Sequence, residues 1–154
     1  MLAEMRGHGT PVGPIEISSF ENEARLVLPD DYSLFLQKNN GGRPIPKFFP
    51  IAGYEGNPFG QVQDFFGIGD SVASCDLLWN FKTFRGRIGS DYLAIAREDG
   101  GNLICLDISK FSRGRVVYWD ARVGRPKVGA GIYEVAPSFD NFLENLRDID
   151  PLNL

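Results

Sequence analysis

The sequence predicts an α+β fold, a single domain in which helices pack on one side of a mainly antiparallel sheet. Apolar residues recur at helical spacing near both ends of the chain, and β-rich runs separated by short turns fill much of its second half. The length of 154 residues is typical of one domain, and no repeat or linker divides the chain.

The N-terminal segment is expected to be irregular before the first helix begins. Residues 1–14 are rich in Gly and Pro, which predicts a flexible arm, and residues 15–154 are expected to form the domain. Ser18 and Glu21 have the spacing of a capping box, in which each side chain satisfies a backbone N–H at the start of a helix. The pair therefore predicts a short helix over residues 18–25.

A stronger helix is predicted from Pro29 to residue 38. Proline suits the first helical turn because its nitrogen has no hydrogen that would be left unpaired. Tyr32 and Phe35 are three residues apart and so share one apolar face. Gly41 and Gly42 are expected to end the helix, since glycine readily adopts the left-handed conformation found at helix C-termini.

The middle of the chain contains one predicted strand and one predicted helix. Residues 47–51 form the strand, and a Gly-rich stretch over residues 53–70 follows it. Ser74 has the position of an N-cap, which predicts a helix over residues 75–84.

The second half is expected to be a β-meander followed by a closing helix. A hairpin turn is expected at Gly101. Ser138 is expected to cap the last helix, whose apolar face includes Phe139 and Phe142. The predicted strands are residues 91–97, 102–108, 115–120 and 132–135.

The composition argues against enzymatic chemistry. The only histidine, His8, lies in a Gly-rich run, and Cys75 and Cys105 lie among apolar neighbours, as buried inert thiols do. Neither a phosphate-binding glycine motif nor a G-x-S-x-G nucleophile motif occurs. We therefore expect no catalytic residue, metal site or cofactor. No apolar stretch of about 20 residues occurs, so we expect a cytoplasmic protein without a membrane partner.

Charge is distributed unevenly along the chain. Residues 1–80 carry 5 basic and 10 acidic side chains, residues 81–133 carry 10 and 5, and residues 134–154 carry 1 and 5. Either these segments offset one another on packing, or they form faces that steer a charged partner. Because the formal net charge is −4, no nucleic-acid partner is expected, although basic residues near aromatic ones could bind one. The basic residues concerned are Arg85, Arg87, Arg113, Arg115, Arg122, Arg125 and Lys127.

Four segments, in order along the chain, resemble a known family. They are residues 28–42, 93–107, 114–120 and 136–146. These resemble the "LP-x-x-Y-x-x-F-L … N-G-G" helix, the "I-A … G-G-N-x-I-x-L-D" hairpin, the "G-x-V-Y-x-W-D" strand and the "A-x-S-F-x-x-F-L-x-x-L" helix of the SUKH superfamily, the Smi/Knr-type group. The motif residues expected to have structural roles are Pro29, Tyr32, Phe35, Gly41, Gly42, Gly101, Asn102, Trp119, Phe139 and Phe142.

The resemblance implies a SUKH-like α+β domain with a non-enzymatic function. For a bacterial member it implies an immunity protein that binds and neutralises a toxin, often a nuclease, of a polymorphic or contact-dependent toxin system. The alternative is a regulatory or scaffold module without a toxin partner, as among the eukaryotic members. The family has no general catalytic residues to carry over, and we expect a monomer or weak oligomer.

A partner site is expected outside these motifs, in the Gly-rich stretch, because loops carry recognition more often than scaffold elements do. A nuclease binds phosphates with a cationic surface, which clustered carboxylates of an inhibitor can mimic. Aromatic residues beside them would act as apolar anchors. The competing interpretation is that the acids are solvated and the phenylalanines belong to the core. The predicted partner-binding residues are Tyr54, Asp64, Phe65, Phe66, Asp70 and Asp76.

Overall fold

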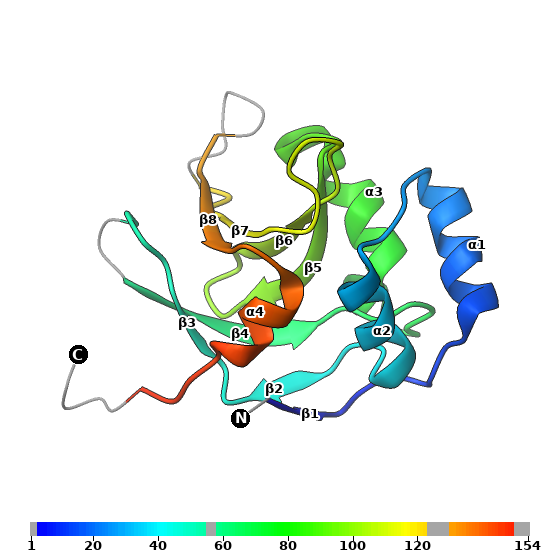
Figure 1. Cartoon of the computed structure of the whole chain (residues 1–154), viewed down its shortest axis with the longest axis horizontal. Helices are drawn as coiled ribbons and strands as arrows, with labels where there is room; N and C mark the ends of the chain where they lie inside the picture. The colour runs from blue at the N-terminus through cyan, green and yellow to red at the C-terminus, as the bar shows by residue number, and fades with distance from the viewer. Residues whose placement is uncertain (1–2, 55–57, 123–129, 150–154) are drawn as a thin grey trace.

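The computed structural model describes residues 3–54, 58–122 and 130–149 of the chain (Figure 1). The helices are α1 (Pro14–Ala24), α2 (Asp30–Lys38), α3 (Leu77–Ile88) and α4 (Phe139–Glu144), with the 3-10 helix η1 (Ala73–Cys75) just before α3. The strands are β1 (Glu4–Arg6), β2 (Arg43–Ile45), β3 (Phe48–Pro50), β4 (Phe59–Phe65), β5 (Tyr92–Glu98), β6 (Leu103–Asp107), β7 (Val116–Trp119) and β8 (Ile132–Ala136).

Strands β3 to β8 form one sheet, in which the order in space equals the order along the chain. Every neighbouring pair in this sheet is antiparallel, so the sheet is a meander. Strands β1 and β2 form a second, small antiparallel sheet. The predicted α+β domain with a mainly antiparallel sheet is confirmed.

Helices cover both faces of the main sheet. Phe65 and Ile104 share one face through their pairings with β5, and the ring centroid of Phe142 in α4 lies 6.3 Å from that of Phe65. Trp119 points to the other face, because its neighbour along the strand is paired with Ile104. There the ring of Phe84 in α3 lies 6.1 Å from the Trp119 ring. Figure 1 shows α3 and α4 on opposite sides of β5.

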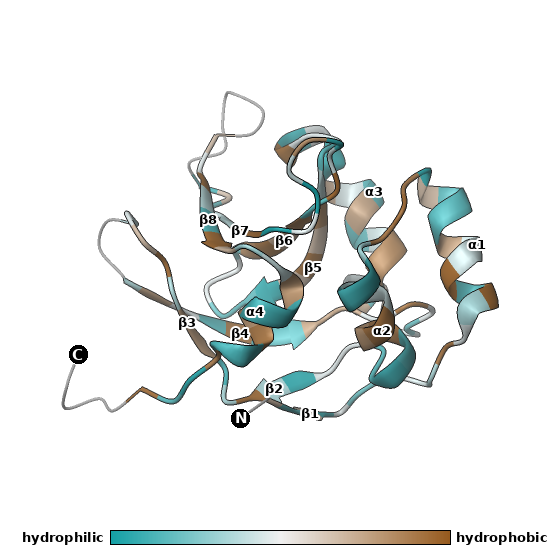
Figure 2. Ribbon diagram, viewed as in Figure 1, coloured by the Kyte–Doolittle hydropathy of each residue, from teal (hydrophilic) through white to brown (hydrophobic). Residues whose placement is uncertain are grey.

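This two-sided cover differs from the expected packing on one side. Strands β6 and β7 are buried along their whole length, and Figure 2 shows the inner strands as mainly hydrophobic. Continuous apolar runs are typical of strands covered on both faces, whereas a strand with one wet face alternates apolar and polar residues. The uninterrupted runs in β6 and β7 therefore already contained the signal.

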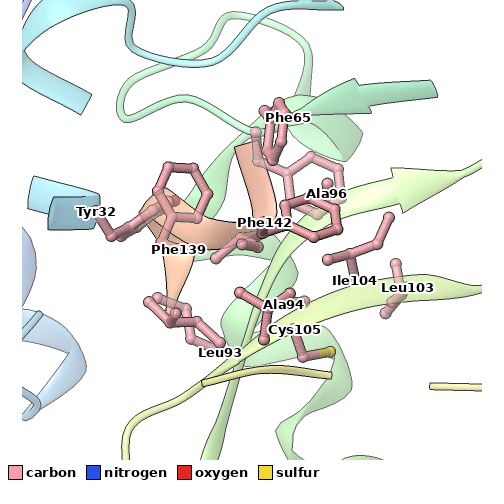
Figure 3. Close-up of a cluster of buried hydrophobic side chains, with 14 of the residues drawn as sticks. Tyr32, Phe65, Leu93, Ala94, Ala96, Leu103, Ile104, Cys105, Phe139 and Phe142 are labelled. Atoms are coloured by element: carbon pink, nitrogen blue, oxygen red, sulfur yellow. The ribbon is translucent and has the colours of Figure 1, made fainter. Parts of the chain in front are cut away.

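An aromatic cluster joins α2, α4 and the sheet (Figure 3). The Phe139 ring centroid lies 5.0 Å from those of Tyr32 and Phe35, and Phe35 lies 5.2 Å from Phe65. Phe142 completes the cluster beside Phe65. These buried rings hold the helices of two motifs against the sheet.

Helix α1 begins earlier than the predicted capping box places it. Its N-cap is Gly13, whose N–H donates to the Glu16 side chain at 2.9 Å, and Pro14 occupies the first helical position. Glu21 instead accepts a hydrogen bond from the backbone N–H of Leu28 at 2.7 Å, so it braces the link to α2. The predicted start at Ser18 is wrong because a Pro four residues upstream already supplies a helix start.

The ends of the other helices follow local capping chemistry. Pro29 is the N-cap of α2, one residue outside the first turn. Asp76, not the predicted Ser74, caps α3, because Ser74 lies inside η1 and the Asp76 carboxylate accepts from the Trp79 N–H. Ser138 caps α4 as predicted, accepting from the Asn141 N–H at 3.1 Å.

Three strands occur where no strand was predicted. Strand β4 runs through the Gly-rich stretch, where Gly60 allows close packing: a Cβ there would lie 2.5 Å from the Phe49 ring. Strands β1 and β2 have three residues each, too few for an alternating pattern. Because β1 lies within residues 1–14 and pairs with β2, this part of the expected flexible arm is a strand of the domain.

Candidate functional site

Two of the predicted apolar anchors, Phe65 and Phe66, are buried. Phe65 and Phe66 are 3% and 0% exposed, respectively. Phe65 belongs to the aromatic cluster, and the guanidinium carbon of Arg97 lies 5.8 Å from the Phe66 ring centroid. Both phenylalanines are core residues, so the prediction that they contact a partner is wrong.

Tyr54 lies apart from the predicted acids, above strand β7. Its hydroxyl donates to the Asp120 carboxylate at 2.7 Å and accepts from Arg122 at 2.9 Å. Its ring packs against that of Tyr118, with centroids 5.3 Å apart. Burial tends to raise the pKa of Asp120, but the hydrogen bonds from Arg122 and Tyr54 outweigh it and lower this pKa below its usual value. Tyr54 is thus part of a separate polar cluster.

The Asp76 carboxylate accepts hydrogen bonds from two backbone N–H groups. One carboxylate oxygen accepts from the Trp79 N–H at 3.0 Å, and the other accepts from the Gly69 N–H at 3.0 Å. The side chain therefore ties the start of α3 to the loop that follows β4. This bonding gives Asp76 a structural role that the sequence pattern did not indicate.

Asp64 and Asp70 are brought together by the fold. They line one pocket of about 300 Å³, together with Arg43, Cys75 and Arg97. The Cys75 sulfur lies 3.6 Å from an Asp64 oxygen, and burial together with this carboxylate raises the pKa of the Cys75 thiol. Since two guanidinium groups balance the two carboxylates, the pocket is polar but not strongly acidic.

Asn40 lines this pocket. Its side-chain amide donates to the Thr10 and Ile68 carbonyl oxygens at 2.8 and 3.0 Å, and its oxygen accepts from the Ile68 N–H at 2.8 Å. Its backbone has a φ of +48°, which Asn tolerates better than most residues. Asn40 thereby joins the N-terminal segment, the end of α2 and the Gly-rich stretch. The N-G-G motif was the available signal for this residue.

Gly41 and Gly42 let β4 approach the end of α2. Both have positive φ, and a Cβ on Gly41 would lie 2.9 Å from the Phe65 carbonyl oxygen. Gly42 exchanges two backbone hydrogen bonds with Phe65, at 3.2 and 2.8 Å. Of the two glycines, Gly42 lines the pocket in addition to following the helix end.

The remaining motif residues are structural. Asn102 is buried, donates to the Tyr118 hydroxyl at 2.7 Å and accepts from the Ala121 N–H at 3.0 Å. Gly101 has a φ of +90° in the hairpin turn. Trp119 is fully buried and donates from its ring nitrogen to the Ala130 carbonyl at 3.2 Å.

Several basic residues of the middle segment contact the domain itself. Arg87 donates to the Ala121 carbonyl at 3.1 Å, and its guanidinium carbon lies 4.9 Å from the Trp119 ring centroid. Arg115 forms an ion pair with buried Asp107 at 2.7 Å. Arg125 and Lys127 lie outside the described residues. These contacts give the arginines packing roles in the domain.

The part of the chain that the structure describes contains neither a cluster of metal ligands nor a membrane-spanning helix. Over residues 3–54, 58–122 and 130–149, no group of three or more His, Cys, Asp or Glu side chains could hold a metal ion. In the same part of the chain, no helix is both long and apolar enough to cross a membrane.

The meander sheet, the helices on its two faces and the buried motif residues define a small α+β domain. The sequence matches the SMI1/KNR4 family (SUKH-1) over residues 11–145, and the chain belongs to this family. It is also similar to the SPbeta prophage-derived uncharacterized protein YokK of Bacillus subtilis (strain 168). The identity is 28% over 150 residues, covering 86% of this chain and 73% of that protein. SUKH domains are often toxin immunity modules and are generally non-enzymatic.

Proposed function

We propose that this protein is a non-enzymatic immunity protein that binds and neutralises a cognate toxin in the bacterial cytoplasm. The observation that carries the proposal is membership of the SUKH-1 family over residues 11–145. The similarity to a prophage-derived protein is consistent with a locus on mobile DNA. The toxin is a protein of a polymorphic or contact-dependent system, such as one with a nuclease domain.

The proposed mechanism is tight binding that blocks the toxin's working surface. The family motifs are occupied in building the core and the turns, so the surface between them is left for recognition. Of the predicted residues, we retain Asp64 and Asp70 as contacts, because both reach one open pocket. Arg43 and Arg97 balance these carboxylates in the free protein, so cations of a phosphate-binding toxin surface would have to replace those arginines beside Asp64 and Asp70.

The direct test is rescue of a poisoned cell. The toxin domain encoded next to this gene is expressed with and without the protein, and growth is measured. We expect growth only when the two are co-expressed, and binding of the purified protein to a catalytically inactive toxin domain. Absence of both rescue and binding rejects the immunity function.

The proposed contacts have their own test. The double variant Asp64→Lys/Asp70→Lys is expected to slow association with the inactive toxin domain by at least about tenfold at low salt. The control Glu144→Lys/Asp148→Lys changes the net charge equally at exposed positions elsewhere. Equal association rates for the two double variants would reject Asp64 and Asp70 as contacts.

A further inference from the structure

The loop between β6 and β7 displays an aromatic side chain to solvent. Phe111 is 100% exposed, the highest value among the large hydrophobic residues of the described chain. Moving an apolar side chain of this size out of water is energetically favourable, and aromatic residues dominate the energetics of protein interfaces. A single exposed apolar residue is ordinary by itself. Phe111 differs from such residues because hydrogen bonds hold its loop in place.

Buried Asp107 holds the loop in one conformation. Its carboxylate accepts from the Ser109 N–H at 2.9 Å, from the Ser109 hydroxyl at 2.6 Å and from the Ser112 hydroxyl at 2.7 Å. The Arg115 side chain donates to it at 2.7 Å, and the Gly114 N–H donates to its backbone oxygen at 2.8 Å. These bonds fix the backbone before and after Phe111. Little further ordering of the loop backbone is therefore needed when a partner binds the ring.

The loop also carries positive charge around its apolar tip. Lys110 and Arg113 are exposed and flank Phe111, whereas Asp107, the last residue of β6 before the loop, is 1% exposed and paired. Arg113 donates to the Leu28 carbonyl at 2.9 Å, which fixes the loop against the link between α1 and α2. The loop itself, residues 108–114, therefore has an apolar centre and carries only positive charges, while exposed Asp91 lies beside its first residue.

This surface is separate from the pocket of Asp64 and Asp70. The Ile108 N–H bonds to the Asp91 carbonyl, directly before β5 begins, whereas Asp64 pairs with Arg97 near the other end of β5. Across a strand of this length the two regions are about 15–20 Å apart. A partner that contacts only one of them can therefore be identified by mutation.

We propose that the Phe111 loop, residues 108–114, is the anchor with which this protein holds its toxin, and that it inserts Phe111 into an apolar pocket edged by carboxylates. The inference rests on the proposed immunity function and adds the position and chemistry of the contact. An apolar centre within a charged rim is the common arrangement of a binding hot spot. A single-stranded nucleic acid fits less well, because such ligands use several aromatic residues along a basic groove.

The test measures the affinity of the inactive toxin domain by titration calorimetry. Phe111→Ala is expected to weaken Kd at least about tenfold, as loss of a hot-spot side chain does. The matched control is Ile15→Ala, since Ile15 is 80% exposed and belongs to α1, outside the loop. Both variants should melt at the wild-type temperature, because neither side chain is buried. Lys110→Glu should also weaken binding, and this loss should shrink at high salt.

The outcomes separate the anchor from the immunity function. Weaker toxin binding by Phe111→Ala supports the proposal that Phe111 is the anchor, whether or not Asp64→Lys/Asp70→Lys also weakens binding. If toxin binds wild type and Phe111→Ala equally, the anchor is wrong while the immunity function stands. If the wild-type protein binds no toxin, both proposals fail. Phe111-dependent binding of a labelled oligonucleotide, or Phe111-dependent dimerisation in sedimentation runs without toxin binding at this loop, also overturns the proposal.

Discussion

Asn40 is the residue whose removal should most affect the region around the Asp64 and Asp70 pocket. It is 2% exposed, and its side chain makes three hydrogen bonds to Thr10 and Ile68. Asn40→Ala deletes all three and places an alanine at a φ of +48°. The backbone groups that lose their partner are near the surface of a pocket, so water can reach some of them.

The magnitude follows from these contacts. At about 1 kcal/mol net for each hydrogen bond, the three bonds contribute about 3 kcal/mol. The left-handed backbone costs alanine about 1 kcal/mol more than asparagine. We therefore expect a loss of about 4 kcal/mol in the free energy of unfolding, which corresponds to a melting temperature roughly 8–16 °C lower for a domain of this size.

The assay is urea unfolding of the full chain, followed by fluorescence and fitted with a common slope. Asn39→Ala is the control, because Asn39 is the neighbouring residue with a φ of −120° and is expected to change stability by less than about 0.5 kcal/mol. Asn40→Asp keeps the acceptor for the Ile68 N–H but turns a carboxylate toward two carbonyl oxygens, so it should be destabilised too. A loss below about 1 kcal/mol for Asn40→Ala would refute this account.

Three further predictions follow from buried groups. Asp107→Ala should lower the free energy of unfolding by about 3 kcal/mol at pH 7. Burial tends to raise the pKa of Asp107, but its hydrogen bonds, including that from Arg115, lower this pKa overall. The stability advantage of the wild type over Asp107→Ala should therefore shrink as pH falls below about 4, measured by acid titrations of unfolding. Gly60→Ala should cost about 2 kcal/mol in urea unfolding, because its Cβ would overlap the buried Phe49 ring, and an unchanged midpoint would contradict this packing. Cys105 is fully buried and its thiol pKa is raised by burial, so a thiol reagent should modify it only on unfolding, and rapid labelling of the native protein would be inconsistent with the fold.

Much of the secondary structure could be predicted because its signals are local. Ser138 caps α4 and the hairpin turn at Gly101 joins β5 to β6, each through contacts within a few residues. Strand β4 was missed because the glycine that suggested a loop serves instead as space for the ring of Phe49, a contact across strands. The cap of α3 was misplaced by two residues, since Ser and Asp are both good caps and η1 decides between them.

The candidate site was predicted less well than the fold. Asp64 and Asp70 do share a pocket, but Arg43 and Arg97 enter it from other strands and balance their charge. Phe65 was expected at the surface and lies in the core. Residue type alone does not say which side of a strand faces the core when the strand itself goes unrecognised.

Periodicity, turn chemistry and composition act over short distances, so the α+β class, the β5–β8 part of the meander, the family and the scarcity of catalytic groups could be inferred from the sequence alone. Which side chains remain in water depended instead on tertiary packing. This packing buries Phe65 and leaves Phe111 fully exposed, although each phenylalanine is preceded by a charged residue. Exposure depends on what packs against a residue from distant parts of the chain, and this fold leaves the Phe111 side chain in water.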